Sequence, residues 1–287
     1  MPSPLDISTK YYFWKPYMAY FEAFELKAYQ GHVSFPDGLI LDLGCGDGTF
    51  AQMLKELLGF ERHVIGVDFD LKRLCAAQRK SVYSQVFRVN IIELPFKEES
   101  FDAVFANQVL YYVRPNPGQA IAEIRRILKK GGKLICTVPI DSADQHYYLT
   151  GILKGIGLTL LGQWHRQRMN IRFFGNGYLS SFSLGGWIKM LKECGLSIQK
   201  VIPYISAAIS RRWSILTLTP FRAMSILKII PSKQVHRLAS IIQKQMMRSY
   251  KHLSISTLPE YGDFILIISE KPDNGTNEDD SKQAKRL

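Results

Sequence analysis

The stretch of residues 40–50 has the residue types and spacing best suited to chemistry. A short apolar run ends in Asp42, and glycines follow at positions 44, 46 and 48. Glycine adopts positive φ and lets a ligand approach the backbone, so this spacing predicts a tight turn built around a ligand. Apolar residues at helical spacing begin at Phe50. The stretch is therefore typical of a strand, a glycine turn and a helix, the first part of a nucleotide-binding unit.

A second acid narrows the class of ligand. Asp68 ends another apolar run, about 20 residues after the glycines, where a carboxylate can bind the two hydroxyls of a ribose. Its alternative role is to cap the following helix. The glycine spacing does not fit the fingerprint of a pyrophosphate-binding turn, because Thr49 stands in place of its third glycine. The residues therefore favour a phosphate-free nucleoside and disfavour a NAD-dependent dehydrogenase.

These motifs resemble those of the class I S-adenosylmethionine-dependent methyltransferases that act on small molecules. The resemblance rests on the glycine motif, on Asp68 and on the run from Glu123 through Arg126 to Gly131-Gly132, and it covers residues 39–139. It implies S-adenosylmethionine as the cofactor. The residues that it implies for binding this cofactor are Asp42, Gly44, Cys45, Gly46, Asp68, Phe69, Asn90, Ile91 and Asn107. Asn90 departs from the family, which has Asp there, but its amide oxygen can still accept a hydrogen bond from adenine.

The pattern of strands and helices predicts an α/β fold. Strands and helices alternate over residues 39–139, with one helix expected over 119–130, and this predicts a doubly wound, mostly parallel, Rossmann-like sheet. The resemblance implies seven strands, the last one antiparallel. We expect an aromatic helical lid in residues 1–38, a methyltransferase domain in 39–271 and a disordered tail in 272–287. Within that domain, segments 141–182 and 207–258 are predicted to be helical cap insertions on the substrate side.

A general base for the acceptor is harder to assign from the sequence. His146 and Tyr147 follow the fifth predicted strand, at the end of the sheet where such folds bind ligands, so they are the catalytic candidates. His165 is the other candidate, and methyl transfer can proceed without a protein base. No metal site is predicted, because the four cysteines are widely spaced and form no paired motif.

The charge is concentrated in one half of the chain. The formal net charge is +12, and residues 141–258 alone carry +13. This predicts an acidic partner, either an anionic membrane surface or a nucleic acid. The basic amphipathic helix expected over 233–251 can cap the pocket or lie on a bilayer. The chain has no apolar run long enough to span a membrane and no secretory signal, so we expect a cytoplasmic protein that can associate with membranes.

Two function hypotheses from different classes of acceptor follow. The first is O- or C-methylation of a small, lipophilic molecule, which the apolar and aromatic insertions favour. The alternative is an RNA methyltransferase that uses the basic half to bind phosphates, although no modular RNA-binding motif is present. A binder that keeps the pocket without catalysis is a third reading. The sequence leaves the oligomeric state open.

Overall fold

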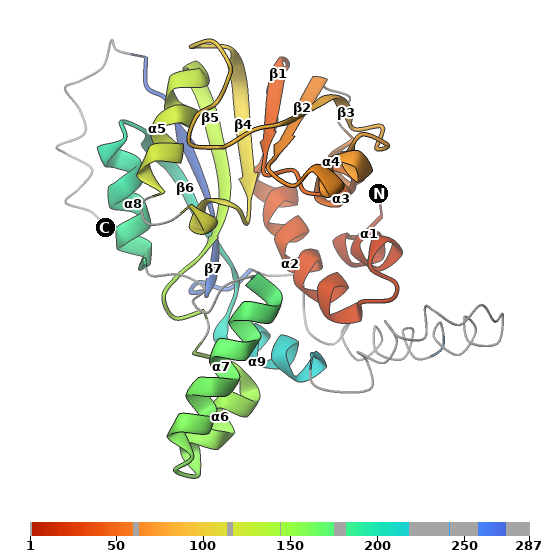
Figure 1. Cartoon of the computed structure of the whole chain (residues 1–287), viewed down its shortest axis with the longest axis vertical. Helices are drawn as coiled ribbons and strands as arrows, with labels where there is room; N and C mark the ends of the chain where they lie inside the picture. The colour runs from red at the N-terminus through yellow and green to blue at the C-terminus, as the bar shows by residue number, and fades with distance from the viewer. Residues whose placement is uncertain are drawn as a thin grey trace.

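A seven-stranded sheet forms the centre of the molecule. The computed structural model describes residues 2–59, 63–113, 117–143, 145–174, 182–217, 241 and 258–273. The strands are β1 (Leu39–Leu43), β2 (His63–Asp68), β3 (Tyr83–Arg88), β4 (Phe101–Asn107), β5 (Leu128–Pro139), β6 (Ser197–Ile205) and β7 (Phe264–Glu270). Their order is β3-β2-β1-β4-β5-β7-β6, and β7 runs antiparallel to both of its neighbours while the remaining pairs are parallel (Figure 1). The predicted fold class is confirmed.

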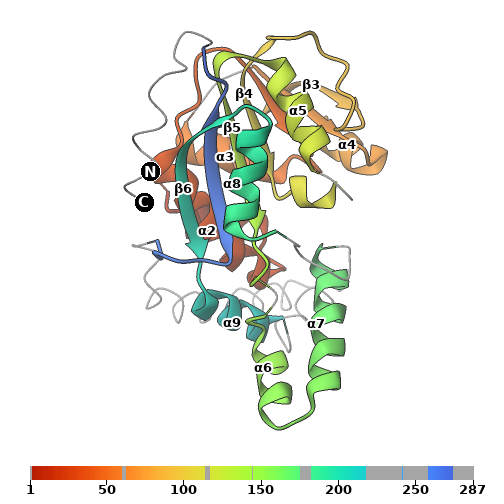
Figure 2. The ribbon, with the colours of Figure 1, turned by 90° about the vertical axis from the view of Figure 1, so that its left-hand side faces the viewer.

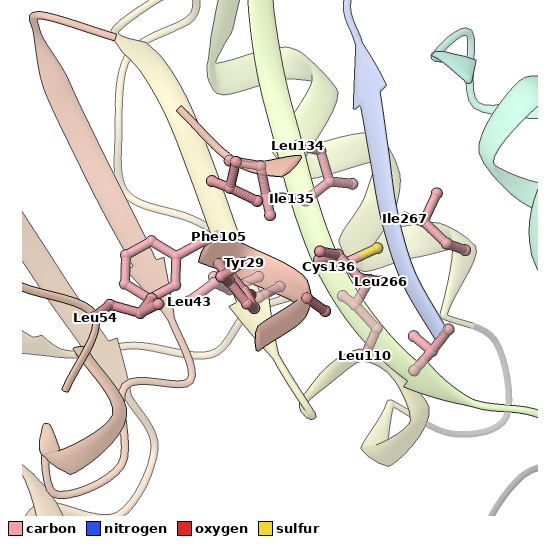
Figure 3. Packing of buried hydrophobic residues seen from close by; sticks show 14 of the residues in the cluster. Tyr29, Leu43, Leu54, Phe105, Leu110, Leu134, Ile135, Cys136, Leu266 and Ile267 are labelled. Carbon is pink, nitrogen blue, oxygen red and sulfur yellow. The ribbon is translucent and has the colours of Figure 1, made fainter. Parts of the chain in front are cut away.

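Helices cover both faces of this sheet. Helices α2 (Pro16–His32) and α3 (Thr49–Leu58) lie on one face, and α5 (Gly118–Ile127) and α8 (Leu184–Glu193) lie on the other (Figures 1 and 2). Figure 3 shows Tyr29 and Leu54 of the first pair packed near Leu43 and Phe105 of the sheet. Because both faces are buried, the strands present their polar groups to a ligand at their carboxyl ends.

The N-terminal aromatic segment forms two helices. Helix α1 (Pro4–Tyr11) begins at the capping residue Ser3, and α2 begins at Pro16, whose fixed φ suits the first helical position. Tyr20 and Phe24 of α2 are buried in the core, so this segment packs as a structural layer. The helix expected over 119–130 ends at Ile127, and that prediction was wrong by three residues. The reason is that Leu128 is extended and pairs with Phe101 of β4.

The first insertion is a helical hairpin. Helices α6 (Tyr148–Gly155) and α7 (Thr159–Phe174) pack on each other and project away from the sheet (Figures 1 and 2). In the second insertion, α9 (Ala207–Leu216) packs against α6 and α2. The helix expected over 233–251 and the tail beyond residue 273 lie outside the described residues. The division into lid, domain and tail stays a prediction.

Candidate functional site

The glycine turn after β1 is fixed to the tip of β2. The amides of Gly44 and Cys45 both donate to the carbonyl oxygen of Val67, at 2.8 and 2.9 Å. The amide of Gly46 donates to Oδ2 of Asp68 at 2.8 Å. Gly44 has a φ of 74°, and a Cβ on it would lie 2.3 Å from Cγ2 of Val109. A side chain at position 44 would therefore clash with Val109, so the turn needs glycine both for its backbone conformation and for this close packing.

Two adjoining cavities open beside this turn. The larger has a volume of about 500 Å³ and the smaller about 320 Å³. Gly44, Asp68, Val109 and Tyr112 line both of them. The shared wall lies at the carboxyl ends of β1, β2 and β4, the expected ligand position in such a sheet. Together the cavities form one elongated site with two compartments of different chemistry.

The smaller compartment suits a purine. Its remaining walls are apolar except for one amide, that of Asn90; they are Phe69, Val89, Asn90, Ile91, Ile92 and Val113. Oδ1 of Asn90 accepts a hydrogen bond from the amide of Ile92 at 3.3 Å and retains a second lone pair for a ligand donor. The structure therefore brings together Asp68, Phe69, Asn90 and Ile91, four of the residues predicted to bind the cofactor.

The larger compartment combines charged groups with aromatic walls. Cys45, Gly46, Asp47 and Asn107 line it from the sheet, and Arg73 lines it from α4 (Leu71–Ala77). Its apolar walls come from the N-terminal segment, from α3, from the stretch after β4 and from α9: Tyr12, Met18, Phe21, Phe50, Val109, Tyr111, Tyr112 and Trp213. The mixture of acids and one guanidinium suits a ligand head that carries both charges, with an apolar group beside it.

Asp42 lies beneath the turn, outside the lining of both cavities. It is 3% exposed, and the hydroxyl of Tyr83 donates to its Oδ2 at 2.5 Å. Burial, together with the nearby charge of Asp68, raises the pKa of Asp42 to about 7, although the Tyr83 hydrogen bond opposes this. In this position Asp42 supports the turn from below, and the structure does not bring it to the ligand space.

The two catalytic candidates are engaged elsewhere. Nδ1 of His146 lies 2.8 Å from Oδ2 of Asp263, which also accepts from Ser210. The hydroxyl of Tyr147 donates to Asn170 at 2.8 Å, and Tyr147 is 2% exposed. Neither residue lines either of the two cavities beside the glycine turn. Both residues directly precede α6. His146 joins this segment to Asp263, which precedes β7 and also binds Ser210 of α9, and Tyr147 joins it to α7.

His165, the other histidine candidate, lies within the hairpin. Its Nδ1 is 2.9 Å from Oγ1 of Thr150, so it joins α7 to α6. Burial lowers the pKa of His165 below its ordinary value. This histidine also lies outside both cavity linings.

Sequence reasoning missed a buried carboxyl pair on α2. Glu22 lines the larger cavity and is 7% exposed, and its Oε2 has no hydrogen-bond donor within the described part of the chain. Glu25, one turn later, is fully buried and accepts from the hydroxyl of Tyr204 at 2.8 Å and from Nε2 of Gln108 at 3.3 Å. Burial raises the pKa of both carboxyls, and for Glu22 the adjacent Glu25 raises it further. The available signal was that these are the two acids in residues 8–30, inside an otherwise aromatic helix.

No metal site accompanies this constellation. In the described ranges, no group of three or more His, Cys, Asp or Glu residues is arranged to hold an ion.

Comparisons with known proteins agree with this geometry. The methyltransferase domain family matches residues 41–136. A demethylmenaquinone methyltransferase of Lactiplantibacillus plantarum is 39% identical over 137 residues, which is 44% of this chain and 57% of that protein. The chain spans about half the length of the curated relatives that it matches first.

Two solved structures share the fold. A methyltransferase of Thermotoga maritima superposes with a TM-score of 0.54 at 20% identity and covers 91% of this chain and 93% of its own. The geranyl diphosphate C-methyltransferase of Streptomyces coelicolor A3(2), solved with S-adenosylhomocysteine, superposes with a TM-score of 0.54 at 15% identity and covers 88% of this chain and 79% of its own.

The two compartments fit the cofactor of this family part by part. The apolar slot with Asn90 suits adenine, Asp68 at the shared wall suits ribose, and the compartment with Arg73 suits an amino-acid head. Gly44 and Val109, which pack against each other, line both compartments where they meet. Residues 41–136 therefore match the methyltransferase domain family, and the chain has the fold of solved S-adenosylmethionine-dependent methyltransferases.

Proposed function

We propose that the chain transfers a methyl group from S-adenosylmethionine to a small, lipophilic acceptor that carries an ionisable hydroxyl. The observation that carries this proposal is the single elongated site, in which the Gly44 turn opens into a compartment walled by aromatic side chains. Such walls exclude water and bury an apolar acceptor. The relatives named for demethylmenaquinone and the fold neighbour named for geranyl diphosphate support an acceptor of this lipophilic class.

The chain's own residues hold the reactants. Asp68 accepts hydrogen bonds from the ribose hydroxyls, Asn90 accepts one from the adenine amino group, and Phe69 and Ile91 lie against the ring. Arg73 pairs with the carboxylate of the amino-acid head. The bound cofactor supplies a methyl group on a positively charged sulfur. Because that charge is lost as the methyl leaves, an apolar compartment favours the transfer.

Glu22 is the proton acceptor in this proposal. Glu22 lines the compartment, its Oε2 has no hydrogen-bond partner in the described part of the chain, and the pKa raised by its burial makes it a stronger base than an exposed glutamate. As an acceptor oxygen bonded to the methyl carbon, its proton would pass to Glu22. Where a ring carbon activated by that oxygen bonded instead, the oxygen would likewise give its proton to Glu22. The ring C–H proton would then leave and the oxygen would take its proton back from Glu22, so that the ring becomes aromatic again. The electron pair of the broken carbon–sulfur bond stays on sulfur. Glu25, held by Tyr204 and Gln108, positions Glu22.

The test follows the label from donor to acceptor class. The full chain is incubated with methyl-labelled S-adenosylmethionine and, separately, with a reduced lipid extract, a water-soluble metabolite fraction and RNA. We expect label in the lipid extract. Label in RNA alone would overturn the proposal, and so would the absence of transfer to every fraction by a chain that binds the cofactor. The RNA alternative finds no support in the names of the reported relatives.

A further inference from the structure

The helical hairpin α6–α7 exposes an unusual number of large apolar side chains. Leu160 is 80% exposed, Ile156 66% and Trp164 56%. Four more large apolar residues of the hairpin are between 42% and 51% exposed: Tyr148, Ile152, Leu158 and Leu161. Isolated exposed apolar residues are ordinary, but a contiguous group on one projecting element marks an interaction surface.

The group is concentrated at the tip. Ile156 and Leu158 belong to the connection between the helices, and Leu160 and Leu161 belong to the first turn of α7. Figures 1 and 2 show that this end of the hairpin points away from the sheet. The tip can therefore enter an apolar phase without any movement of the domain. Trp164 follows one turn later, with the guanidinium of Arg168 4.9 Å from its ring centroid.

The charges on the hairpin are of one sign. No acid occurs between Gln145 and Lys192, whereas Lys154, Arg166 and Arg168 lie on the hairpin itself. The hairpin therefore has an apolar tip, a tryptophan one turn above it and basic residues around it. This pattern is typical of an element that lies in the interface of an anionic bilayer. In the described part of the chain, no helix is both long and apolar enough to cross a membrane.

We propose that the tip of the α6–α7 hairpin docks the chain on an anionic lipid surface. The apolar tip enters the boundary between headgroups and acyl chains, Trp164 lies at the headgroup level, and the basic residues contact lipid phosphates. Charge complementarity selects this occupant over an uncharged apolar partner.

The base of the hairpin adjoins the larger cavity. The ring centroid of Tyr147, which precedes α6, lies 6.1 Å from that of Trp213, and Trp213 lines the cavity. A docked hairpin therefore places the aromatic wall of the site near the bilayer, from which a lipophilic acceptor can enter. This delivery role rests on the proposed function, whereas the docking itself does not.

Vesicle sedimentation with the full chain tests the docking without any cofactor. We expect binding to vesicles of phosphatidylglycerol with phosphatidylcholine, and weaker, salt-insensitive binding to phosphatidylcholine alone. Replacing both tip leucines, Leu160→Ser with Leu161→Ser, should weaken binding to anionic vesicles at least about tenfold, since two apolar side chains no longer leave water. The matched control is Leu71→Ser, which removes a leucine that is 57% exposed on α4, away from the hairpin.

The intrinsic fluorescence of Trp164 gives a second readout. Its emission should shift to shorter wavelength when anionic vesicles are added, and Trp164→Phe should remove that shift. Equal binding by the tip variant and the wild type would overturn the proposal. Self-association that the tip variant abolishes, with no vesicle binding, would assign the tip to a second copy of the chain instead. Cofactor binding is measured separately, so a failed docking test leaves the proposed function standing.

Discussion

Replacing Gly44 with alanine tests the construction of the turn most directly. The residue has a φ of 74°, and an added Cβ would approach Cγ2 of Val109 to 2.3 Å and its Cβ to 2.9 Å. A left-handed backbone costs an L-residue about 1–2 kcal/mol. Forcing a methyl group into a packed contact costs about 1–3 kcal/mol more. We therefore expect Gly44→Ala to lower the free energy of unfolding by about 2–5 kcal/mol.

Two other glycines separate these two costs. Gly59 ends α3 with a φ of 65° and has no neighbour within 4 Å of an added Cβ, so Gly59→Ala should cost the backbone contribution alone, about 1–2 kcal/mol. Gly31 lies within α2 with open space around it, and Gly31→Ala should stabilise the protein by about 0.5–1 kcal/mol.

Urea unfolding monitored by circular dichroism gives the three free energies, and calorimetry gives the affinity for S-adenosylhomocysteine. Because Val109 lines both cavities, its displacement in Gly44→Ala should weaken that ligand by about tenfold or more, whereas Gly59→Ala should leave its affinity unchanged. The reasoning would be refuted if Gly44→Ala destabilised the protein no more than Gly59→Ala and bound the ligand normally. The contact with Val109 would then not be the reason for glycine at position 44.

Three further predictions concern the acids of the site. Asp68→Asn should weaken S-adenosylhomocysteine by about tenfold in calorimetry, because hydrogen bonds to a charged acceptor contribute about 1.5–3 kcal/mol; unchanged affinity would contradict a role at the ribose. The pKa of Asp42 is raised to about 7 in the fold, so its burial destabilises the protein increasingly as pH rises from 5 to 7. In urea unfolding, the free energy of unfolding of Asp42→Asn should therefore rise by about 2 kcal/mol relative to that of the wild type between pH 5 and pH 7. A difference between the two proteins that does not change with pH would refute the raised pKa of Asp42. Glu22→Gln should weaken sinefungin, whose amine replaces the transferable methyl, by about tenfold and leave S-adenosylhomocysteine unchanged, with Glu98→Gln as the exposed control. Equal weakening of both ligands would place Glu22 at the amino-acid head.

The parts of the fold that sequence predicted are those set by local patterns. The glycine turn and Asp68 lie within a continuous stretch of alternating strands and helices, so their order along the chain determines their place at the carboxyl ends of β1 and β2. The end of α5 could not be placed as well. The run from Leu128 to Lys130 is compatible with a helix, and it is extended because β4 offers Leu128 a pairing partner.

Asp42 shows why a residue's place in a motif does not fix its exposure. It occupies a strand end, as Asp68 does, and both were predicted to reach the ligand. The difference arises from β3, which lies two strands from β1, because the hydroxyl of Tyr83 donates to Asp42 there. No pattern near residue 42 contains that information, since the two residues are 41 positions apart.

The carboxyl pair on α2 depends on still more distant partners. Glu25 meets Gln108 from the loop after β4 and Tyr204 from the end of β6, which is 179 residues away in sequence. A helix pattern would place Glu22 and Glu25 on a solvated face, because burying two carboxyls costs free energy. In the fold, Tyr204 and Gln108 both donate to Oε1 of Glu25, while Glu22 lines the cavity. Two carboxyls buried side by side lower the stability of the fold. Their position beside the aromatic compartment is therefore better explained by a role in the reaction than by a role in stability.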